Sequence, residues 1–558
     1  MKTWKRIAAV AGLLCVTSVL GACSSGTKDA PTNKDGKTIV TLGRQTIQNA
    51  KLPKGDSYED NAYTRLLEKE LDVELKSAFE ANGDDYNRQV SLAIASGDMP
   101  DMMLVDTREE LEELVENDLV ADLTEVFDKH ASGGLKDIYA SYDEIPIEDA
   151  TFDNKLMAIP ATSVDFGPGL VWVRQDWIDQ LGLKVDTDGD KVLTLDELKT
   201  ITENFIDKDP GGTGKPVGLA LNYWLTAPGY GSSTYVSTPI MNAFGAYPKY
   251  YLTDEKGQVF YGSNTEATKE ALTYLKGWFD EGLLDPQFGT RTFDDITAMV
   301  INGETGVVPG PWHLPDWNLF QVRETIPDVN FVPYAVSNQN GDGKINSVSD
   351  KGTGKYIVVK KDFAKPELAV EMVNVIYDKL ANSDDLEKEY PEIYEYSKAG
   401  VDGTARPFNC EITDADSQLD DAIAIAAAVD GEITIDELPN FGSKDAAQTI
   451  KSYLEDPKNA KATDWAKYNS VYQAEAKTMA ATKDAGLLNE LTPPKFNNIE
   501  ALTKNGAQLN KVEEEAFLKF VTGEESLDKF DDYVAKWQEQ GGTAALKEMQ
   551  AVIDAKNK

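Results

Sequence analysis

The fold is decided by the stretch between residues 152 and 198. It reads FDNKLMAIP (residues 152–160), VWVRQDW (residues 171–177) and DTDGDKVLTLDEL (residues 186–198). The first segment is typical of a strand that leaves one lobe, and the second of a buried strand that runs into a helix. The third has the spacing of a calcium-binding loop. Together they predict that the chain crosses here into a second lobe, whose entry the loop stiffens.

Strands and helices alternate in the region before this crossing. Strand patterns lie at residues 38–42, 73–79 and 102–105, and amphipathic helical patterns at residues 61–71, 85–96 and 111–119. Such alternation is typical of an α/β lobe with a largely parallel sheet. Because 558 residues are too many for one compact core, we predict an α/β protein with two lobes.

A secretion signal is expected at the start of the chain. Basic residues at positions 2, 5 and 6 precede an apolar run at residues 7–20, which is too short to span a bilayer comfortably. The run ends in LGAC (residues 20–23), which resembles a bacterial lipobox. We therefore predict that Cys23 is lipidated and becomes the first residue of the mature protein. The alternative is an ordinary signal peptide with an accidental cysteine.

Composition narrows the choice of partners. Acidic residues outnumber basic ones by 95 to 55, which gives a net charge of −40. Such a chain is repelled by nucleic acid and gains nothing from anionic lipid surfaces, so contact with the membrane is expected through the N-terminal lipid only. If Cys23 is acylated, Cys410 has no partner, and we expect it to be a small buried apolar residue without a disulfide.

Residues 186–197 match the ligand spacing of an EF-hand loop, with one departure. Oxygen donors stand at the positions that a calcium ion requires, namely Asp186, Asp188, Asp190, the carbonyl of Val192, Thr194 and Glu197. Lys191 occupies the position of the sharp-turn glycine. We predict one structural Ca²⁺ here, and the alternative is a solvated acidic turn with an aspartate as the helix cap.

Two further loops repeat this pattern incompletely. Residues 338–349 keep the glycine at position six but place Ser349 where the closing carboxylate belongs. Residues 426–437 keep only the second half, because Ala426 and Ala428 stand at ligand positions. A plain Gly/Asn loop is expected for the first, and a turn with a capped helix and no ion for the second.

Several motifs carry a resemblance to a known family. YNRQV (residues 86–90), AIASGDMPD (residues 93–101) and LVADLT (residues 119–124) resemble the first lobe of extracellular solute-binding proteins (family 1) of carbohydrate ABC importers. The strand-to-helix segment at residues 171–178 continues the resemblance, and the pattern at residues 517–537 is similar to the closing helices of the long lipoprotein subgroup of Gram-positive bacteria. Relatives that bind alginate have an EF-hand-like calcium loop in a similar place.

This resemblance implies a periplasmic-binding-protein-like fold with a ligand cleft between two lobes. It further implies a monomer on the extracellular face of a Gram-positive cell membrane, which captures a carbohydrate, expected to be an oligosaccharide, for the permease subunits of an ABC importer. The expected division of the chain is a signal peptide at residues 1–22, a lipidated flexible tether at 23–37, a first lobe at 38–160 and 354–490, and a second lobe at 161–353 and 491–558.

Trp312 is the leading candidate for contact with the ligand. PGPWH (residues 309–313) follows a predicted helix, turn and buried strand at residues 298–308. The segment is similar to the Gly-x-Trp segment of maltodextrin-type binding proteins, in which the tryptophan stacks on a sugar. The alternative is core packing. The other candidates are the aromatic residues Tyr223, Trp224 and Trp317 and the polar residues Arg44 and Asp165.

The sequence offers little for catalysis. Only two histidines are present, His130 and His313, and neither lies near a nucleophile-elbow motif. A P-loop, a dinucleotide fingerprint and a Cys/His metal cluster are missing from the sequence. We therefore expect no enzyme. A secreted lipid-anchored glycan-active enzyme and a calcium-dependent surface adhesion protein remain the alternatives.

Overall fold

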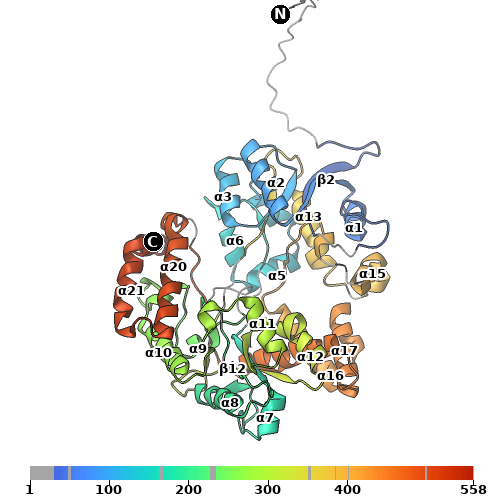
Figure 1. Ribbon diagram of the computed structural model, residues 1–558. Helices are drawn as coiled ribbons and strands as arrows, with labels where there is room; N and C mark the ends of the chain where they lie inside the picture. The colour runs from blue at the N-terminus through green and yellow to red at the C-terminus, as the bar shows by residue number, and fades with distance from the viewer. Residues whose placement is uncertain are drawn as a thin grey trace, which may run out of the picture.

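The computed structural model describes residues 30–47, 52–162, 167–226, 234–349, 353–383, 385–399, 401, 403–496 and 499–556. The chain forms two lobes, one above the other in Figure 1. This arrangement confirms the predicted two-lobed α/β class. The predicted signal peptide, residues 23–29 of the predicted tether with Cys23, and Asp165 lie outside the described residues.

The first lobe is built on a five-stranded sheet with the order β2-β1-β3-β14-β6. β1 (Thr38–Thr46) runs parallel to β2 (Val73–Asn82) and to β3 (Met102–Val105). β14 (Tyr356–Val359) is antiparallel to β3, and β6 (Ile159–Pro160) is antiparallel to β14. β1, β2 and β3 are therefore parallel, as their alternation with helices predicts.

Helices cover this sheet, and two of them are bounded by residues with clear capping roles. α1 (Ala62–Glu70) begins at Asn61, whose side chain accepts hydrogen bonds from the backbone N–H groups of Tyr63 and Thr64. α2 (Gly83–Ser96) ends at Gly97, which has φ = +68°, a left-handed conformation that glycine adopts without steric cost. The fully apolar strands β3 and β14 lie in the centre of the core between the helices.

The second lobe is built on a four-stranded sheet with the order β11-β7-β12-β8. β7 (Leu170–Arg174) is antiparallel to β11 (Val307–Gly310) and to β12 (Phe331–Val336), and β8 (Val192–Leu193) is parallel to β12. β7 continues directly into α7 (Gln175–Leu181). The prediction of a buried strand that runs into a helix is therefore confirmed.

The end of the chain packs on this second lobe. α20 (Glu500–Thr522) and α21 (Phe530–Trp537) bury Phe517, Phe520 and Trp537 in the same core as the helices α8 (Leu195–Lys208) and α10 (Glu266–Asp280). α20 and α21 form the red column at the left of Figure 1.

The segment before these helices differs from the sequence-based division. Trp465, Met479 and neighbouring apolar residues pack in one core with Trp172 of β7. β15 (Leu488–Leu491) pairs with β13 (Ile345–Val348) of the second lobe. Residues 417–491 therefore belong to the second lobe, whereas the expectation placed residues 354–490 in the first. Helical periodicity shows which face of a helix is apolar, but it does not show which core that face joins.

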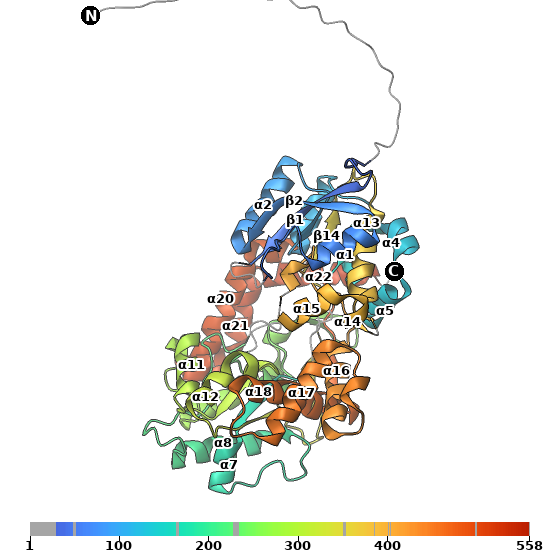
Figure 2. The same ribbon diagram turned by 90° about the vertical axis from the view of Figure 1, so that its right-hand side faces the viewer.

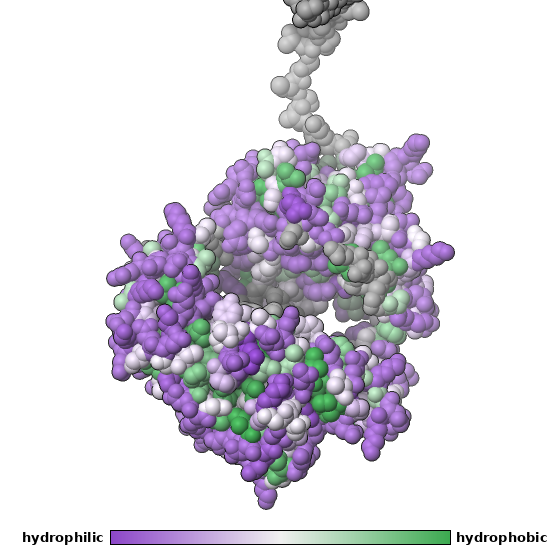
Figure 3. Space-filling model, in the orientation of Figure 1, coloured by the Kyte–Doolittle hydropathy of each residue, from purple (hydrophilic) through white to green (hydrophobic). Residues whose placement is uncertain are grey.

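The chain passes between the lobes three times. It crosses after β6, returns before β14, and crosses again between Ile412, in the first core, and α16 (Ser417–Asp430). Hydrophilic residues dominate the face shown in Figure 3. Among the described residues, none of the helices is long and apolar enough to cross a membrane.

Candidate ligand cleft and metal loop

One edge of the first-lobe sheet faces the second lobe. Tyr356 pairs with Val105 at the end of β3 and with Pro160 at the end of β6. The chain leaves for the second lobe just after Pro160 and returns just before Tyr356, so this edge lies at the crossings. β1 is parallel to β3 and ends at the same edge. Open α/β sheets bind ligands outside the carboxyl ends of their strands, so this is where a ligand is expected.

A pocket of about 290 Å³ lies at this edge. Its lining includes Thr107 and Arg108 just after β3, Thr353 and Tyr356 at the return crossing, and Lys495 from the segment after β15. The side chains of Arg108 and Tyr356 both bond to Asp149. The pocket is therefore lined from the first lobe, a crossing and a segment between two elements of the second lobe.

The sheet register places Trp312 at the corresponding edge of the second lobe. Gly310, at the end of β11, pairs with Leu170, the first residue of β7 after the crossing. Pro311 and Trp312 follow Gly310 directly, so they leave the sheet on the side from which the chain arrives. Sequence reasoning had no access to this register, and the structure supplies it.

Trp312 lies at the border of a core. The side chain is half-buried against the core that contains Trp172, and its ring lies edge-on to His313, with 5.1 Å between ring centroids. Its indole Nε1 is buried and has no hydrogen-bond partner in the described part of the chain. A half-buried tryptophan has one face of its ring in the core and leaves part of its ring surface accessible.

The other aromatic candidates come from segments joined to the end of β11. The backbone N–H of Tyr235 donates to the carbonyl of Pro309 (2.9 Å), and that of Asn222 donates to the carbonyl of Tyr235 (2.8 Å). Tyr223 and Trp224 follow Asn222 and contact each other edge to face at 4.8 Å between ring centroids.

Trp317 belongs to the helical turn that follows Trp312. It lies against Phe293 at 5.5 Å between ring centroids, and half of its surface is exposed. Tyr223 is 44% exposed, so both of these residues offer ring surface to solvent. A planar exposed ring is the kind of surface on which the apolar face of a sugar stacks.

The structure reveals a polar cluster on the first lobe that sequence reasoning missed. The Lys355 Nζ donates to the carbonyl of Asn409 (2.9 Å) and lies 3.5 Å from the Gln45 Oε1 and 3.7 Å from the Asp106 Oδ1. The Asn409 Nδ2 donates to the same Gln45 oxygen at 3.0 Å. These residues come from four distant segments. The available signal was the position of Gln45 and Asp106 at the carboxyl ends of parallel strands.

Arg44 is buried and does not belong to this polar cluster. It is 1% exposed, and its guanidinium donates to the carbonyls of Ala405 and Arg406 at 3.4 Å each. Burial lowers the pKa of Arg44 to about 10. This corrects the expectation that Arg44 contacts the ligand, because its side chain turns inward to hold residues 405–406 against β1.

The predicted metal loop brings its three aspartates together. A carboxylate oxygen from each of Asp186, Asp188 and Asp190 lies within 4.8 Å of the other two. Glu197 joins the two ends of the loop, since its Oε1 accepts from the backbone N–H of Asp186 (3.2 Å) and its Oε2 from that of Thr194 (3.0 Å). These oxygen donors are of the kind that Ca²⁺ prefers.

The backbone also takes the turn that such a loop requires. Lys191, which replaces the usual glycine at position six, has φ = +62°. Val192 and Leu193 then pair with Ala335 and Val336, as a short strand. Thr194 caps α8, with its side chain accepting from the N–H of Glu197. The residues present therefore fit a Ca²⁺ ion, even though Lys191 departs from the usual sequence.

Electrostatics at this loop favour a cation. Burial raises the pKa of Asp186, and the neighbouring carboxylates of Asp190 and Asp188 raise it further. Like charges held this close repel one another. A bound cation would relieve the repulsion and complete the hydrogen-bonded loop.

The two weaker loops have the expected shapes. Gly341 and Gly343 adopt positive φ, and amide groups of Asn338 and Asn340 bond to the carboxylate of Asp342. In the other loop, Thr434 and Glu437 form a reciprocal cap on a short helical turn. The carboxylate of Asp342 therefore accepts hydrogen bonds within a turn, and that of Glu437 accepts them within a helix cap.

Cys410 is buried, and burial raises the pKa of its thiol to about 11. A thiol with a raised pKa is a poor nucleophile at neutral pH. This placement confirms the prediction of a small buried side chain in an apolar core.

Comparison with known proteins agrees with this arrangement. The profile of the family "bacterial extracellular solute-binding protein" matches residues 62–378, more than half of the chain. Two curated relatives come from Bacillus subtilis (strain 168). Lipoprotein LipO is 22% identical over 506 residues, which is 88% of each chain. The polygalacturonan/rhamnogalacturonan-binding protein YtcQ is 21% identical over 411 residues, 72% of this chain and 71% of that one.

A solved structure shares the fold over nearly the whole chain. It is the HMO-binding, ABC-transporter-associated solute-binding protein of Bifidobacterium longum infantis. The TM-score is 0.60 at 16% identity, and the likeness covers 93% of this chain and 99% of that one. At this identity the likeness establishes the two-lobed fold.

Proposed function

Because this chain belongs to the family of bacterial extracellular solute-binding proteins, we propose that it captures an oligosaccharide between its lobes and delivers it to an ABC importer. The family is one of binding proteins and not of enzymes, so the expectation of a non-enzyme is confirmed and the glycan-active enzyme is set aside.

The observation that carries the proposal is the placement of Trp312. The register of β11 on β7 puts this tryptophan at the lobe-facing edge, and the Gln45–Asp106–Lys355–Asn409 cluster occupies the carboxyl edge of the opposite sheet. A ring on one side and hydrogen-bonding groups on the other are the two kinds of contact that a sugar needs. Closure of the lobes would bring them onto one ligand.

The relatives support a saccharide and a lipid anchor. YtcQ binds polygalacturonan and rhamnogalacturonan, the Bifidobacterium protein is HMO-binding and associated with an ABC transporter, and LipO is a lipoprotein. We infer that this chain is held by a lipid on Cys23 at the outer face of a Gram-positive membrane. It would work there as a monomer with the importer permeases.

A Ca²⁺ ion in the 186–197 loop belongs to the same proposal. Asp186, Asp188, Asp190, Val192, Thr194 and Glu197 would hold it. The ion would neutralise the clustered carboxylates and would fix the start of α8. Its role would be structural, with no part in a reaction. Its contribution is stability of the second lobe.

The test is direct binding. The protein without its signal peptide is titrated by calorimetry with neutral oligosaccharides and with galacturonan and rhamnogalacturonan fragments, and lobe closure is followed by small-angle X-ray scattering. Binding with a fall in the radius of gyration is expected. Binding without closure would point to an adhesion protein, and turnover of a glycan would reinstate the enzyme.

A further inference from the structure

Away from the crossings, one pair of aromatic rings joins the two lobes. Tyr394 lies on α15 (Pro391–Ala399) and Phe441 on α17 (Phe441–Glu455). Their rings meet edge to face, with 5.3 Å between centroids and 81° between planes. α15 packs in a cluster with α1 of the first lobe, and α17 packs with α16 and the helices of the second. Figure 2 shows α15 of the first lobe directly above α17 of the second.

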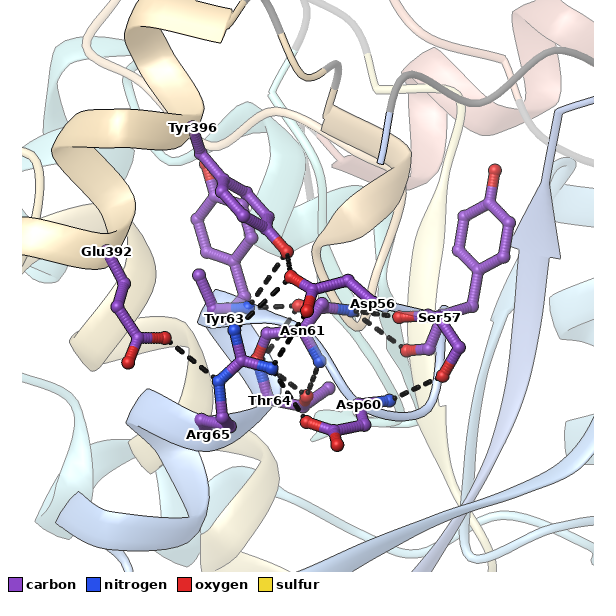
Figure 4. Close-up of polar contacts among 11 residues, drawn as sticks. Asp56, Ser57, Asp60, Asn61, Tyr63, Thr64, Arg65, Glu392 and Tyr396 are labelled. Atoms are coloured by element: carbon purple, nitrogen blue, oxygen red, sulfur yellow. Dashed lines mark hydrogen bonds and ion pairs between the residues drawn. The ribbon is translucent and has the colours of Figure 1, made fainter. Parts of the chain in front are cut away.

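α15 is fixed to the first lobe by a charged network around Arg65 (Figure 4). The Arg65 guanidinium bonds to Asp60 (2.7 Å), Asp56 (3.2 Å) and, on α15, Glu392 (2.9 Å). Tyr396 of α15 donates to the same Asp56 and accepts from the backbone N–H of Ala62 at 3.2 Å. Tyr394 is therefore carried on a helix that moves with the first lobe.

α17 is fixed to the second lobe by apolar packing. Ala447 and Ile450 are fully buried against α16, and Tyr453 is buried in the core that contains Trp172. Asn440 caps the helix by accepting from the N–H of Ser443 (2.9 Å). Phe441 is therefore carried on a helix that moves with the second lobe.

The contact between these two helices is narrow. A pocket of about 360 Å³ lies beside the ring pair and is lined from both lobes. The first lobe contributes Asp385 and Glu387, and the second contributes Lys444. A few rings and facing opposite charges can be separated at modest cost, unlike a continuous core.

We propose that Tyr394 and Phe441 form a latch that holds the lobes together before any ligand binds. The latch sets the fraction of ligand-free molecules in the closed arrangement. An edge-to-face pair favours the state in which it is formed by roughly three- to tenfold. Apparent affinity scales with the fraction of molecules that are competent to bind. The consequence for affinity rests on the proposed function, whereas the latch itself does not.

The test measures the distance between the lobes without ligand. Spin labels at Ser91→Cys on α2 and Lys208→Cys on α8, in the mature chain with Cys23→Ser, report the distribution of interlobe distances. Phe441→Ala is expected to shift the closed-to-open ratio by roughly three- to tenfold toward open. Phe441→Tyr, which keeps the ring, should retain the closed population.

Two comparisons separate the latch from a loss of folding. Leu454→Ala removes an exposed apolar side chain from the same helix outside the ring pair, and it should leave the distances unchanged. The melting temperature of Phe441→Ala should stay close to that of the wild type. An unchanged distance distribution in Phe441→Ala overturns the latch. If the wild type binds no saccharide, the proposed function fails. The interlobe distances without ligand still show whether the latch exists.

Discussion

The indole Nε1 of Trp172 donates a hydrogen bond of 3.1 Å to the carbonyl of Pro311. Trp172 is fully buried in β7, and Pro311 is the residue before Trp312. A buried tryptophan in the central strand thus anchors the turn that carries the candidate sugar-stacking residue. Because proline also restricts its own backbone, the conformation of this turn is constrained on both counts.

Trp312→Ala should weaken ligand binding by roughly tenfold or more, which corresponds to about 1.4 kcal/mol, with a small change in melting temperature. Calorimetry and thermal unfolding of the same variant measure the two effects. Trp465→Ala is the matched control, because Trp465 is fully buried in the neighbouring core and its loss should cost about 3–5 kcal/mol of stability. If Trp312→Ala behaved like that control and kept its affinity, the stacking role would be lost.

Lys355→Met should also weaken ligand binding. The substitution acts on the first lobe and leaves Trp312, on the second lobe, unchanged. The ammonium of Lys355 organises Gln45, Asp106 and Asn409 at the edge of the first lobe. Without it, Asp106 loses its ion pair with Lys355 and the amides of Gln45 and Asn409 lose the group that holds them. Calorimetry with the ligand of the wild type measures the loss, and Lys361→Met, an exposed lysine paired with Asp118, is the control. Equal affinities of the two variants would contradict the role of the cluster.

Calcium should raise the melting temperature, and a chelator should lower it. An ion present at a hundredfold excess over its dissociation constant stabilises the fold by about 2.7 kcal/mol. Asp186→Ala should abolish the response because it removes the first ligand. Asp342→Ala, in the loop at residues 338–349, should keep the response. Scanning calorimetry measures these melting temperatures. If the wild type melted at the same temperature with calcium and with chelator, the loop would be a solvated acidic turn without an ion.

Stability should fall as the pH rises from about 4.5 to about 8, through Glu475. This side chain is 2% exposed, and burial raises its pKa from 4.5 to about 8, although Gln418 donates a hydrogen bond to it. The folded chain keeps the proton over this interval while the unfolded chain releases it. The stabilisation is therefore complete below the unfolded pKa and is lost as the pH passes through the folded one.

Glu475→Gln should flatten this slope, because an amide keeps the buried hydrogen bond and does not titrate. Urea unfolding at pH 5 and pH 8 measures the difference between the variant and the wild type. Glu437→Gln, at an exposed helix cap, is the comparison. A slope that persists in Glu475→Gln would assign the pH dependence to other groups.

Cys23→Ala should release the protein into the culture medium. The prediction rests on the lipobox at residues 20–23. Mass spectrometry of the wild-type N-terminus should find a modified Cys23 as the first residue. A mature protein that begins beyond Cys23 would contradict the lipid anchor.

Much of the fold follows from local patterns. The alternation of strands and helices before residue 120 gives a parallel sheet, and the run at residues 171–177 gives β7 and α7, because periodicity reports local structure. The assignment of residues 417–491 failed because choosing a core is a long-range decision. The burial of Arg44 and the Gln45–Lys355 cluster depend on contacts over more than 300 positions of sequence, which no local pattern carries.

The three crossings between the lobes also constrain the order in which the lobes can fold as the chain is synthesised. The first lobe needs β14 and residues up to Ile412 to close its core, and by then much of the second lobe has already been synthesised. The second lobe in turn needs helices that reach residue 556. The first lobe can complete its core only after Ile412 has been synthesised, and the second only after the last helices. A chain truncated between Ile412 and its last helices would therefore contain every buried residue of the first core but lack those that complete the second.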